Sequence, residues 1–114
     1  MVKEFTNDSP EDVGKGSFKN DGGKAPVFRG ALSYFPRAIS AVAELSLVGS
    51  RTHRWDGWRD LPDGYNRYSD ALVRHLIREG SGEVLDPGSG LLHATHACWN
   101  SLARLELLLK EREV

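Results

Sequence analysis

The sequence has a single cysteine, Cys98, so the chain has no second thiol with which to form an intrachain disulfide. This cysteine usage suits a reducing compartment, and we expect the protein to work in the cytoplasm. Long apolar runs are also missing, both behind the charged N-terminus and elsewhere in the chain. We therefore expect a protein that is neither exported nor embedded in a membrane.

An excess of charge of one sign is absent as well. The chain has 15 Lys and Arg residues against 16 Asp and Glu residues, which gives a formal net charge of -1. Because bulk positive charge drives binding to phosphate backbones and acidic lipids, no direct binding to nucleic acid or to a membrane is expected. The 114 residues, of which 39% are hydrophobic, are enough for one small globular domain.

The alternation of apolar and polar residues that is typical of β-strands is missing, and the apolar residues recur at helical spacing instead. The sequence predicts three helices, from residues 33–36 to 49, from 66 to 79 and from 90 to 110. The first is apolar almost all the way round, so we expect it to be buried. The third has leucines at too many positions for one stripe and is expected to pack on its own domain and on a second copy. The predicted fold class is all-α, a small helical bundle of about three main helices completed by oligomerisation into a dimer or tetramer.

The N-terminal residues have few large apolar side chains. We predict a flexible arm over residues 1–24, followed by a helical domain over residues 25–114. The end of the arm is rich in glycine and carries Lys24, a composition that lets backbone N–H groups and an ammonium approach an anion. The alternative is a solvated tail.

The stretch from residue 82 to residue 100 is the most informative part of the chain. Its prolines and glycines indicate a loop, and Ser89 is predicted to cap the helix that follows. His93, His96 and Asn100 are spaced so that they project from one face near the start of that helix. A polar stripe is therefore predicted where core would be expected.

Histidines one turn apart can hold a divalent cation. Asp86 and Glu83 lie just upstream of His93 and His96, where a loop can fold carboxylates toward the same ion. The alternative is a set of partly buried, hydrogen-bonded side chains without a ligand.

Two further polar residues fall within apolar helical patterns. Glu44 lies in the middle of the first helix, where its carboxylate is costly to desolvate without a cation or several donors, so we predict a functional role for it. The alternative is an ordinary polar stripe with Arg37 and Ser40. His75 lies on the apolar face of the second helix, where it can meet polar groups of the other helices or serve as a structural core histidine.

The loop between the first two helices is dense in large polar and aromatic groups. Such groups can hold a phosphate and stack a base, or they can cover a small core and meet a partner. They are Arg51, His53, Arg54, Trp55, Trp58 and Arg59.

Short motifs follow one another along residues 19–106. They are Asp-Gly-Gly-Lys (21–24), Ala-Glu (43–44), Gly49 with Trp58, Arg-His-Leu (74–76), Gly-Glu (82–83), Asp-Pro (86–87), Ser-Gly-Leu (89–91) and His-x-x-His-Ala-x-x-Asn (93–100). In this order the set resembles the phage family described as the dATP/dGTP diphosphohydrolase N-terminal domain, which is related to the MazG-like all-α nucleoside triphosphate pyrophosphatases.

The resemblance implies a nucleotide pyrophosphohydrolase in the cytoplasm of a host cell. Such an enzyme would convert a purine deoxynucleoside triphosphate to the monophosphate and pyrophosphate with a divalent metal, Mg or Mn, and with Zn or Fe favoured by imidazole ligands. Carried onto this chain, the catalytic candidates are Glu44, His75 and Asp86, and the metal candidates are Glu44, Asp86, His93 and His96. The substrate-binding candidates are Lys24, Arg51, His53, Trp58, Glu83 and Asn100.

The chain departs from MazG-like enzymes in its carboxylates. The Glu-x-x-Glu pair that holds magnesium in those enzymes is not intact, because Ala41 and Leu47 flank Glu44 at the spacing of three. The alternative function is therefore a non-catalytic protein that binds or sequesters a nucleotide. A third reading is a structural oligomer in which the histidines only pack.

Overall fold

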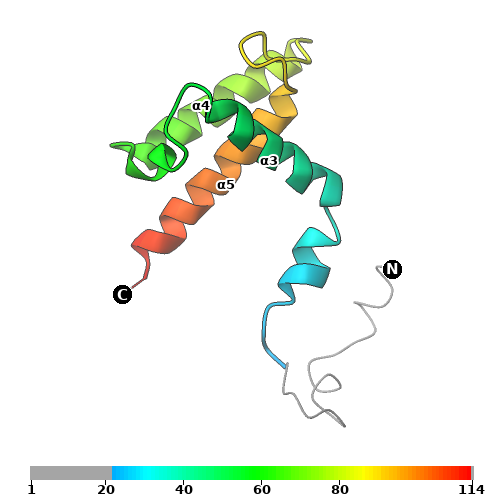
Figure 1. Ribbon diagram of the computed structural model, residues 1–114, viewed down its shortest axis with the longest axis vertical. Helices are drawn as coiled ribbons and strands as arrows, with labels where there is room; N and C mark the ends of the chain where they lie inside the picture. The colour runs from blue at the N-terminus through cyan, green and yellow to red at the C-terminus, as the bar shows by residue number, and fades with distance from the viewer. Residues whose placement is uncertain (1–21, 114) are drawn as a thin grey trace. The chain divides into compact units, whose positions relative to one another are not determined.

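The computed structural model describes residues 22–113, which form helices joined by loops. The order is a π-helical turn η1 (Phe28–Leu32), α3 (Pro36–Gly49), a 3-10 turn η2 (Gly57–Asp60), α4 (Gly64–Gly80) and α5 (His93–Glu111) (Figure 1). Within the described residues the only β-pairing is an isolated bridge between Leu85 and Leu92. The prediction of an all-α fold is confirmed, and the three α-helices lie within a few residues of their predicted positions.

The chain divides into two compact units, residues 1–35 and 36–114. In the first unit the description begins at Gly22, and η1 contains no buried residue. The predicted arm over residues 1–24 falls almost wholly outside the described residues, and its boundary stays a prediction.

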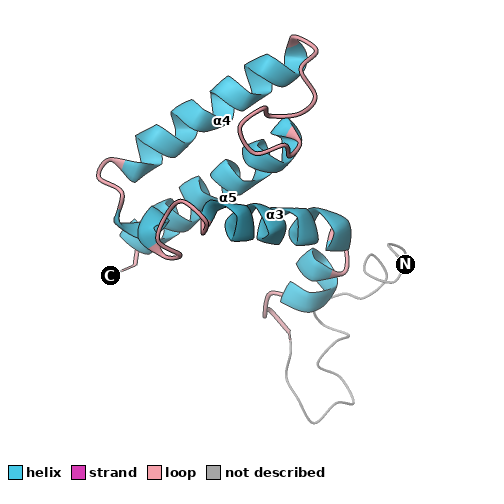
Figure 2. Ribbon diagram, turned by 45° about the horizontal axis from the view of Figure 1, so that its top comes forward, coloured by secondary structure: helices cyan, strands magenta, loops and turns pink. Residues whose placement is uncertain are grey.

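Helices α4 and α5 form an antiparallel pair and α3 packs against α5 (Figures 1 and 2). The pair is close where α4 begins, since a Cβ at the buried Gly64 would lie 3.1 Å from Leu107 Cδ1. Arg104 on α5 donates from Nε to Ser69 Oγ at 2.6 Å and from a terminal nitrogen to the Tyr65 hydroxyl at 3.0 Å, both on α4. These contacts fix the register of the two helices that carry the histidines.

The buried core of the described residues is small and centred on α5. Its apolar members are Ala97 and Ala103, and its polar members are His93, Thr95 and Asn100. The predicted polar stripe at the start of this helix is therefore confirmed. None of the helices formed by residues 22–113 combines the length and apolar character that a membrane span needs.

The expectation that the first helix is buried is wrong for this chain. Helix α3 has no buried residue, and Ile39 and Leu47 are 37% and 54% exposed. The reason is that α5 covers α3 only in part.

Candidate functional site

The loop between α4 and α5 carries Asp86 to the first turn of α5. Gly90 has a φ of 74°, which favours glycine, and it lets the chain turn back on itself. Backbone N–H groups of Asp86 and Gly90 donate to Leu91 O and Asp86 O, both at 2.7 Å. The Leu85–Leu92 bridge closes the turn and holds its carboxylate near the histidines.

The prediction that Ser89 caps the last helix is wrong. The N-cap is Leu92, which makes no side-chain cap bond, and the helix begins at His93 because the bridge keeps the chain extended up to Leu92. Instead of capping the helix, Ser89 contacts Asp86 and His96. Its Oγ lies 2.9 Å from Asp86 Oδ2 and 2.7 Å from His96 Nε2.

The direction of these hydrogen bonds follows from the charge of Asp86. Burial raises the pKa of this carboxyl. Two hydrogen bonds from Ser89, one from its hydroxyl and one from its N–H, lower the pKa, as does the charge of the nearby His96 and His75. These opposing effects outweigh burial, so the net pKa is below its ordinary value. An ionised carboxylate only accepts, so Ser89 Oγ donates to Asp86 and accepts from His96 Nε2–H. In a nucleophilic triad the histidine takes the serine proton instead. Ser89 is therefore a link between two groups and is not arranged as a nucleophile.

A second chain of contacts runs through the fully buried His93. Its Nε2 lies 2.7 Å from Glu83 Oε1, and its Nδ1 lies 2.8 Å from His75 Nδ1. Because the carboxylate accepts, Nε2 of His93 carries a proton, and in the tautomer with its single proton there Nδ1 has a lone pair. The prediction that His75 meets polar groups of the other helices is confirmed.

His75 also stacks on His96, with ring centroids 4.3 Å apart and an interplanar angle of 13°. Burial is the main cause that lowers the pKa of His75, followed by the positive charge that His96 would add, and Asp86 opposes the shift. Burial likewise lowers the pKa of His96, again against Asp86. Both rings are therefore neutral at pH 7, with lone pairs that can take a proton or a metal ion.

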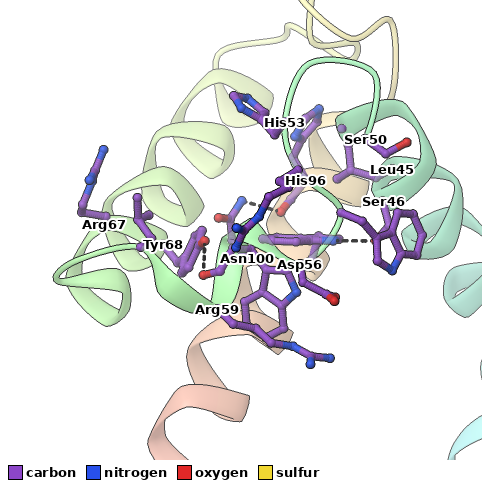
Figure 3. A pocket seen from close by; sticks show the side chains of 17 residues that line it. Leu45, Ser46, Ser50, His53, Asp56, Arg59, Arg67, Tyr68, His96 and Asn100 are labelled. Atoms are coloured by element: carbon purple, nitrogen blue, oxygen red, sulfur yellow. Dashed lines mark hydrogen bonds between the residues drawn. The ribbon is translucent and has the colours of Figure 1, made fainter.

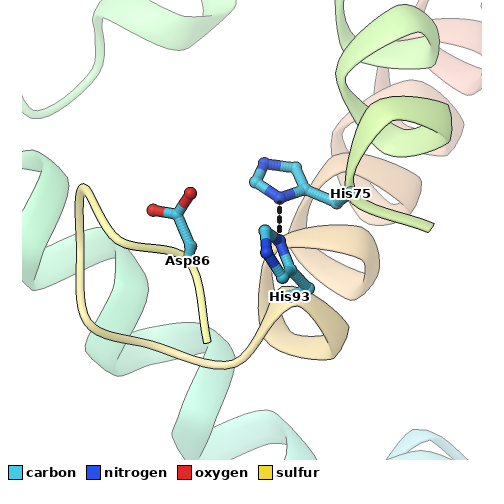
Figure 4. Close-up of side chains that lie close together, drawn as sticks. All are labelled: His75, Asp86 and His93. Carbon is cyan, nitrogen blue, oxygen red and sulfur yellow. Dashed lines mark hydrogen bonds between the residues drawn. The ribbon is translucent and has the colours of Figure 1, made fainter. Parts of the chain in front are cut away.

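Three of these side chains offer a set of metal donors. One ligand atom each from His75, Asp86 and His93 lie within 4.8 Å of one another (Figure 4). Two imidazoles and a carboxylate suit zinc, iron or manganese better than magnesium, which prefers oxygen ligands. Of the predicted metal candidates, the structure brings Asp86 and His93 together with His75, while Nε2 of His96 is bonded to Ser89.

Glu44 stands apart from this cluster. Its side chain is exposed on α3, where it lines a shallow hollow with Arg37, Ser40 and neighbouring residues. The expectation of a desolvated carboxylate in the core is wrong, because α5 leaves this part of α3 open to solvent. Within one chain, Glu44 does not join the group formed by His75, Asp86 and His93.

A cavity of about 700 Å³ lies between α3, the loop after it and the two packed helices (Figure 3). The predicted substrate-binding residues His53, Trp58 and Asn100 line it, as does His96. The other lining residues include Ser46, Arg54, Trp55, Asp56, Arg59, Arg67, Tyr68 and Trp99. The cavity therefore combines arginines, aromatic rings and the two histidines His53 and His96.

Two predicted substrate-binding residues of the second unit lie elsewhere: Arg51 is exposed and does not line the cavity, and Glu83 is engaged with His93. Lys24 belongs to the first unit, and its role in substrate binding stays a prediction.

The aromatic wall of the cavity is held by its own contacts. Trp58 and Trp99 meet edge to face with centroids 5.8 Å apart. The Tyr68 hydroxyl donates to Trp58 O at 2.7 Å, and Trp99 Nε1 donates to Ser46 Oγ at 3.0 Å. Arg59 lies over the Trp58 ring at 5.5 Å. Rings fixed in this way can present a constant surface to a planar ligand.

Sequence reasoning missed Arg67, Tyr68 and Trp99 as cavity residues. Trp99 follows His96 by three positions on the helix, so it shares its side, and this spacing could have indicated it. The position of Arg67 depends on how α4 packs, and no local pattern reveals it.

The comparisons with known proteins agree with the motifs. A family model described as dATP/dGTP diphosphohydrolase, N-terminal, matches residues 15–114. No curated protein and no solved structure matches the chain.

Proposed function

The chain belongs to the dATP/dGTP diphosphohydrolase N-terminal family, and from this membership we propose that it hydrolyses a purine deoxynucleoside triphosphate to the monophosphate and pyrophosphate. The family description names a hydrolase, and the family model that matches residues 15–114 describes the N-terminal domain of that hydrolase. The substrate and the cleavage position are our inference.

The cavity is the observation that carries this proposal. Arg54, Arg59 and Arg67 bring guanidinium groups, which match phosphate oxygens in charge and geometry. Trp58 and Trp99 supply aromatic surface for a purine. A volume of about 700 Å³ suits a ligand of nucleotide size.

His96 is the lining residue best suited to take a proton. Its lowered pKa keeps it neutral near pH 7, and its Nε2–H is committed to Ser89, so Nδ1 is the nitrogen that can accept. In the proposed reaction, water attacks the α-phosphorus and the bond to the bridging oxygen breaks. The water proton passes to His96 and pyrophosphate leaves with the electron pair of the broken bond. A divalent ion carried in with the triphosphate supplies charge neutralisation.

A second candidate function rests on the position of Glu44. Its carboxylate is exposed and stands apart from Asp86 and the histidines, so a single chain does not assemble the carboxylate-rich metal site of MazG-like enzymes. The same cavity would then bind or sequester a nucleotide without cleaving it.

The test is an incubation of the purified protein with ribo- and deoxynucleoside triphosphates and magnesium or manganese, followed by chromatography of the products. We expect monophosphate and pyrophosphate in equal amounts from a purine deoxynucleotide, and we expect His96→Gln to abolish them while the circular dichroism spectrum is unchanged. Intact nucleotide retained through gel filtration would support the binding function. If the incubation yields no hydrolysis product and no nucleotide is retained on the protein, both functions are overturned.

A further inference from the structure

We propose that His75, Asp86 and His93 form a binding site for a transition-metal ion of the zinc type, which ties α4 and the loop after it to the start of α5. The site is distinct from the magnesium that accompanies a nucleotide. It also does not depend on whether the chain hydrolyses nucleotides.

The donors come from three separate segments and converge. His75 comes from α4, Asp86 from the loop and His93 from the first turn of α5, and their ligand atoms lie within 4.8 Å of one another. The two Nδ1 atoms face each other at 2.8 Å (Figure 4). A cation held by both nitrogens and the carboxylate needs about 2.0–2.1 Å to each nitrogen, so it would replace this hydrogen bond as the two rings move slightly apart, and zinc sites are built from such donors.

The partners behind the donors support the same assignment. Glu83 accepts from Nε2 of His93 at 2.7 Å and so turns the unprotonated Nδ1 toward His75. Asp86 is held by the hydroxyl and the N–H of Ser89, both at 2.9 Å from Oδ2. Metal-binding histidines are commonly oriented in this way by a carboxylate, and ligating carboxylates are hydrogen-bonded in turn.

The burial of His93 indicates what the ion does for the protein. This side chain is 0% exposed, in a unit whose apolar core is limited to a few small residues of α5. A metal that joins three segments compensates for a small core, because its binding energy is available only to the folded chain. Three protein donors also leave a coordination position for water or another ligand.

The competing arrangement is a metal-free hydrogen bond from His75 Nδ1–H to His93 Nδ1. To separate the two, the chain is purified without an affinity tag, stripped of metal and titrated with Zn²⁺ and with Co²⁺ by calorimetry. We expect one ion per chain, a rise in melting temperature with each ion, a cobalt absorption spectrum of low coordination number and no displacement by excess Mg²⁺. Absence of binding would overturn the proposal.

Variants locate the site. His75→Gln and Asp86→Asn are expected to weaken Zn²⁺ binding at least tenfold, and Glu83→Gln by about 10–100-fold through the orientation of His93. The exposed His53→Gln serves as the matched histidine control and is expected to keep the affinity. Equal loss in His53→Gln and His75→Gln would overturn this choice of ligands.

The cluster lies at a packed junction, so a variant that fails to fold would not locate the ligands. Wild-type protein loaded with Co²⁺ provides the second measurement. Paramagnetic shifts of the ring protons of His75 and His93, and not of those of His53, are expected in its NMR spectrum. Unshifted His75 and His93 rings in cobalt-loaded protein would contradict the assignment.

Discussion

The hydroxyl of Ser89 lies 2.7 Å from Nε2 of His96 and accepts its N–H. The same hydroxyl donates to Asp86 at 2.9 Å, so a serine joins a carboxylate to an imidazole. The link fixes which nitrogen of His96 carries a proton. It also connects the cavity, which His96 lines, to the cluster that contains Asp86.

Replacing Ser89 with alanine tests this link as a positioning device. If the cavity hydrolyses nucleotides as proposed, Ser89→Ala is expected to lower kcat about tenfold or more and to change KM little, because His96 keeps its ring but loses its orientation. General acid–base catalysis contributes about 10²–10⁴-fold, and a misplaced base forfeits part of it. Steady-state kinetics with one purine deoxynucleotide across pH would measure the effect.

Two further variants control this experiment. Ser89→Thr retains the hydroxyl and is expected to restore most of kcat. Ser81→Ala removes an exposed hydroxyl that donates to Ile77 O and is expected to have no effect. An unchanged kcat in Ser89→Ala would show that His96 does not depend on this contact.

Arg67 tests the cavity as a phosphate site. Arg54, Arg59 and Arg67 all line the cavity, but Arg54 is paired with Asp60 at 2.9 Å and Arg59 lies over the Trp58 ring. A hydrogen bond to a charged group contributes about 1.5–3 kcal/mol, so Arg67→Gln is expected to weaken nucleotide binding about 10–100-fold. Calorimetry with a non-hydrolysable triphosphate would measure it. Arg112→Gln, at the exposed C-cap of α5, is the matched control, and equal affinities in both variants would place the phosphates elsewhere.

Much of the fold could be predicted because its determinants are local. Pro36, Gly49 and Gly80 mark helix ends, and the spacing of apolar residues gives the helices between them. The burial of α3 could not be predicted correctly, because burial depends on how much of the helix its neighbours cover.

The candidate site was predictable only in its parts. The spacing of His93, His96 and Asn100 on one helix is local, and the structure confirms that they form a polar stripe. The pairing of His75 with His93 depends on the register of α4 and α5, and the role of Ser89 depends on the turn at Gly90. Such relationships follow from tertiary packing, which no single segment encodes.

Acid is expected to destabilise the metal-free protein. The first loss of stability comes from the protonation of histidines as the pH falls. The pKa values of His75 and His96 are lowered from 6.5, so as the pH falls below 6.5 the unfolded chain binds protons that the folded chain does not. Stability is therefore greatest above pH 6.5 and declines below it, by at most about 1.4 kcal/mol per pH unit for each group. Asp86 adds a further loss below pH 3.8, since its pKa is lowered from that value.

Urea unfolding in the presence of a chelator, at a series of pH values from neutral to acid, would measure this slope. The double variant His75→Gln/His96→Gln is expected to flatten this slope just below pH 6.5. A wild-type stability that does not vary over this range would contradict the lowered pKa values.

Self-association is expected from an apolar stripe on α5. Leu102, Leu105 and Leu109 recur at helical spacing and are 45%, 51% and 54% exposed in the single chain. Burial of such side chains against a second copy stabilises the assembly by about 25 cal/mol per Å² of apolar surface, which favours a dimer or tetramer.

Leu105→Glu places a charge in the stripe and is expected to shift the molar mass toward the monomer in light scattering after gel filtration. Ser81→Glu adds the same charge at the exposed C-cap of α4, outside the stripe, and is expected to leave the assembly intact. A wild-type chain that stays monomeric at micromolar concentrations would show that this stripe does not bind a second copy.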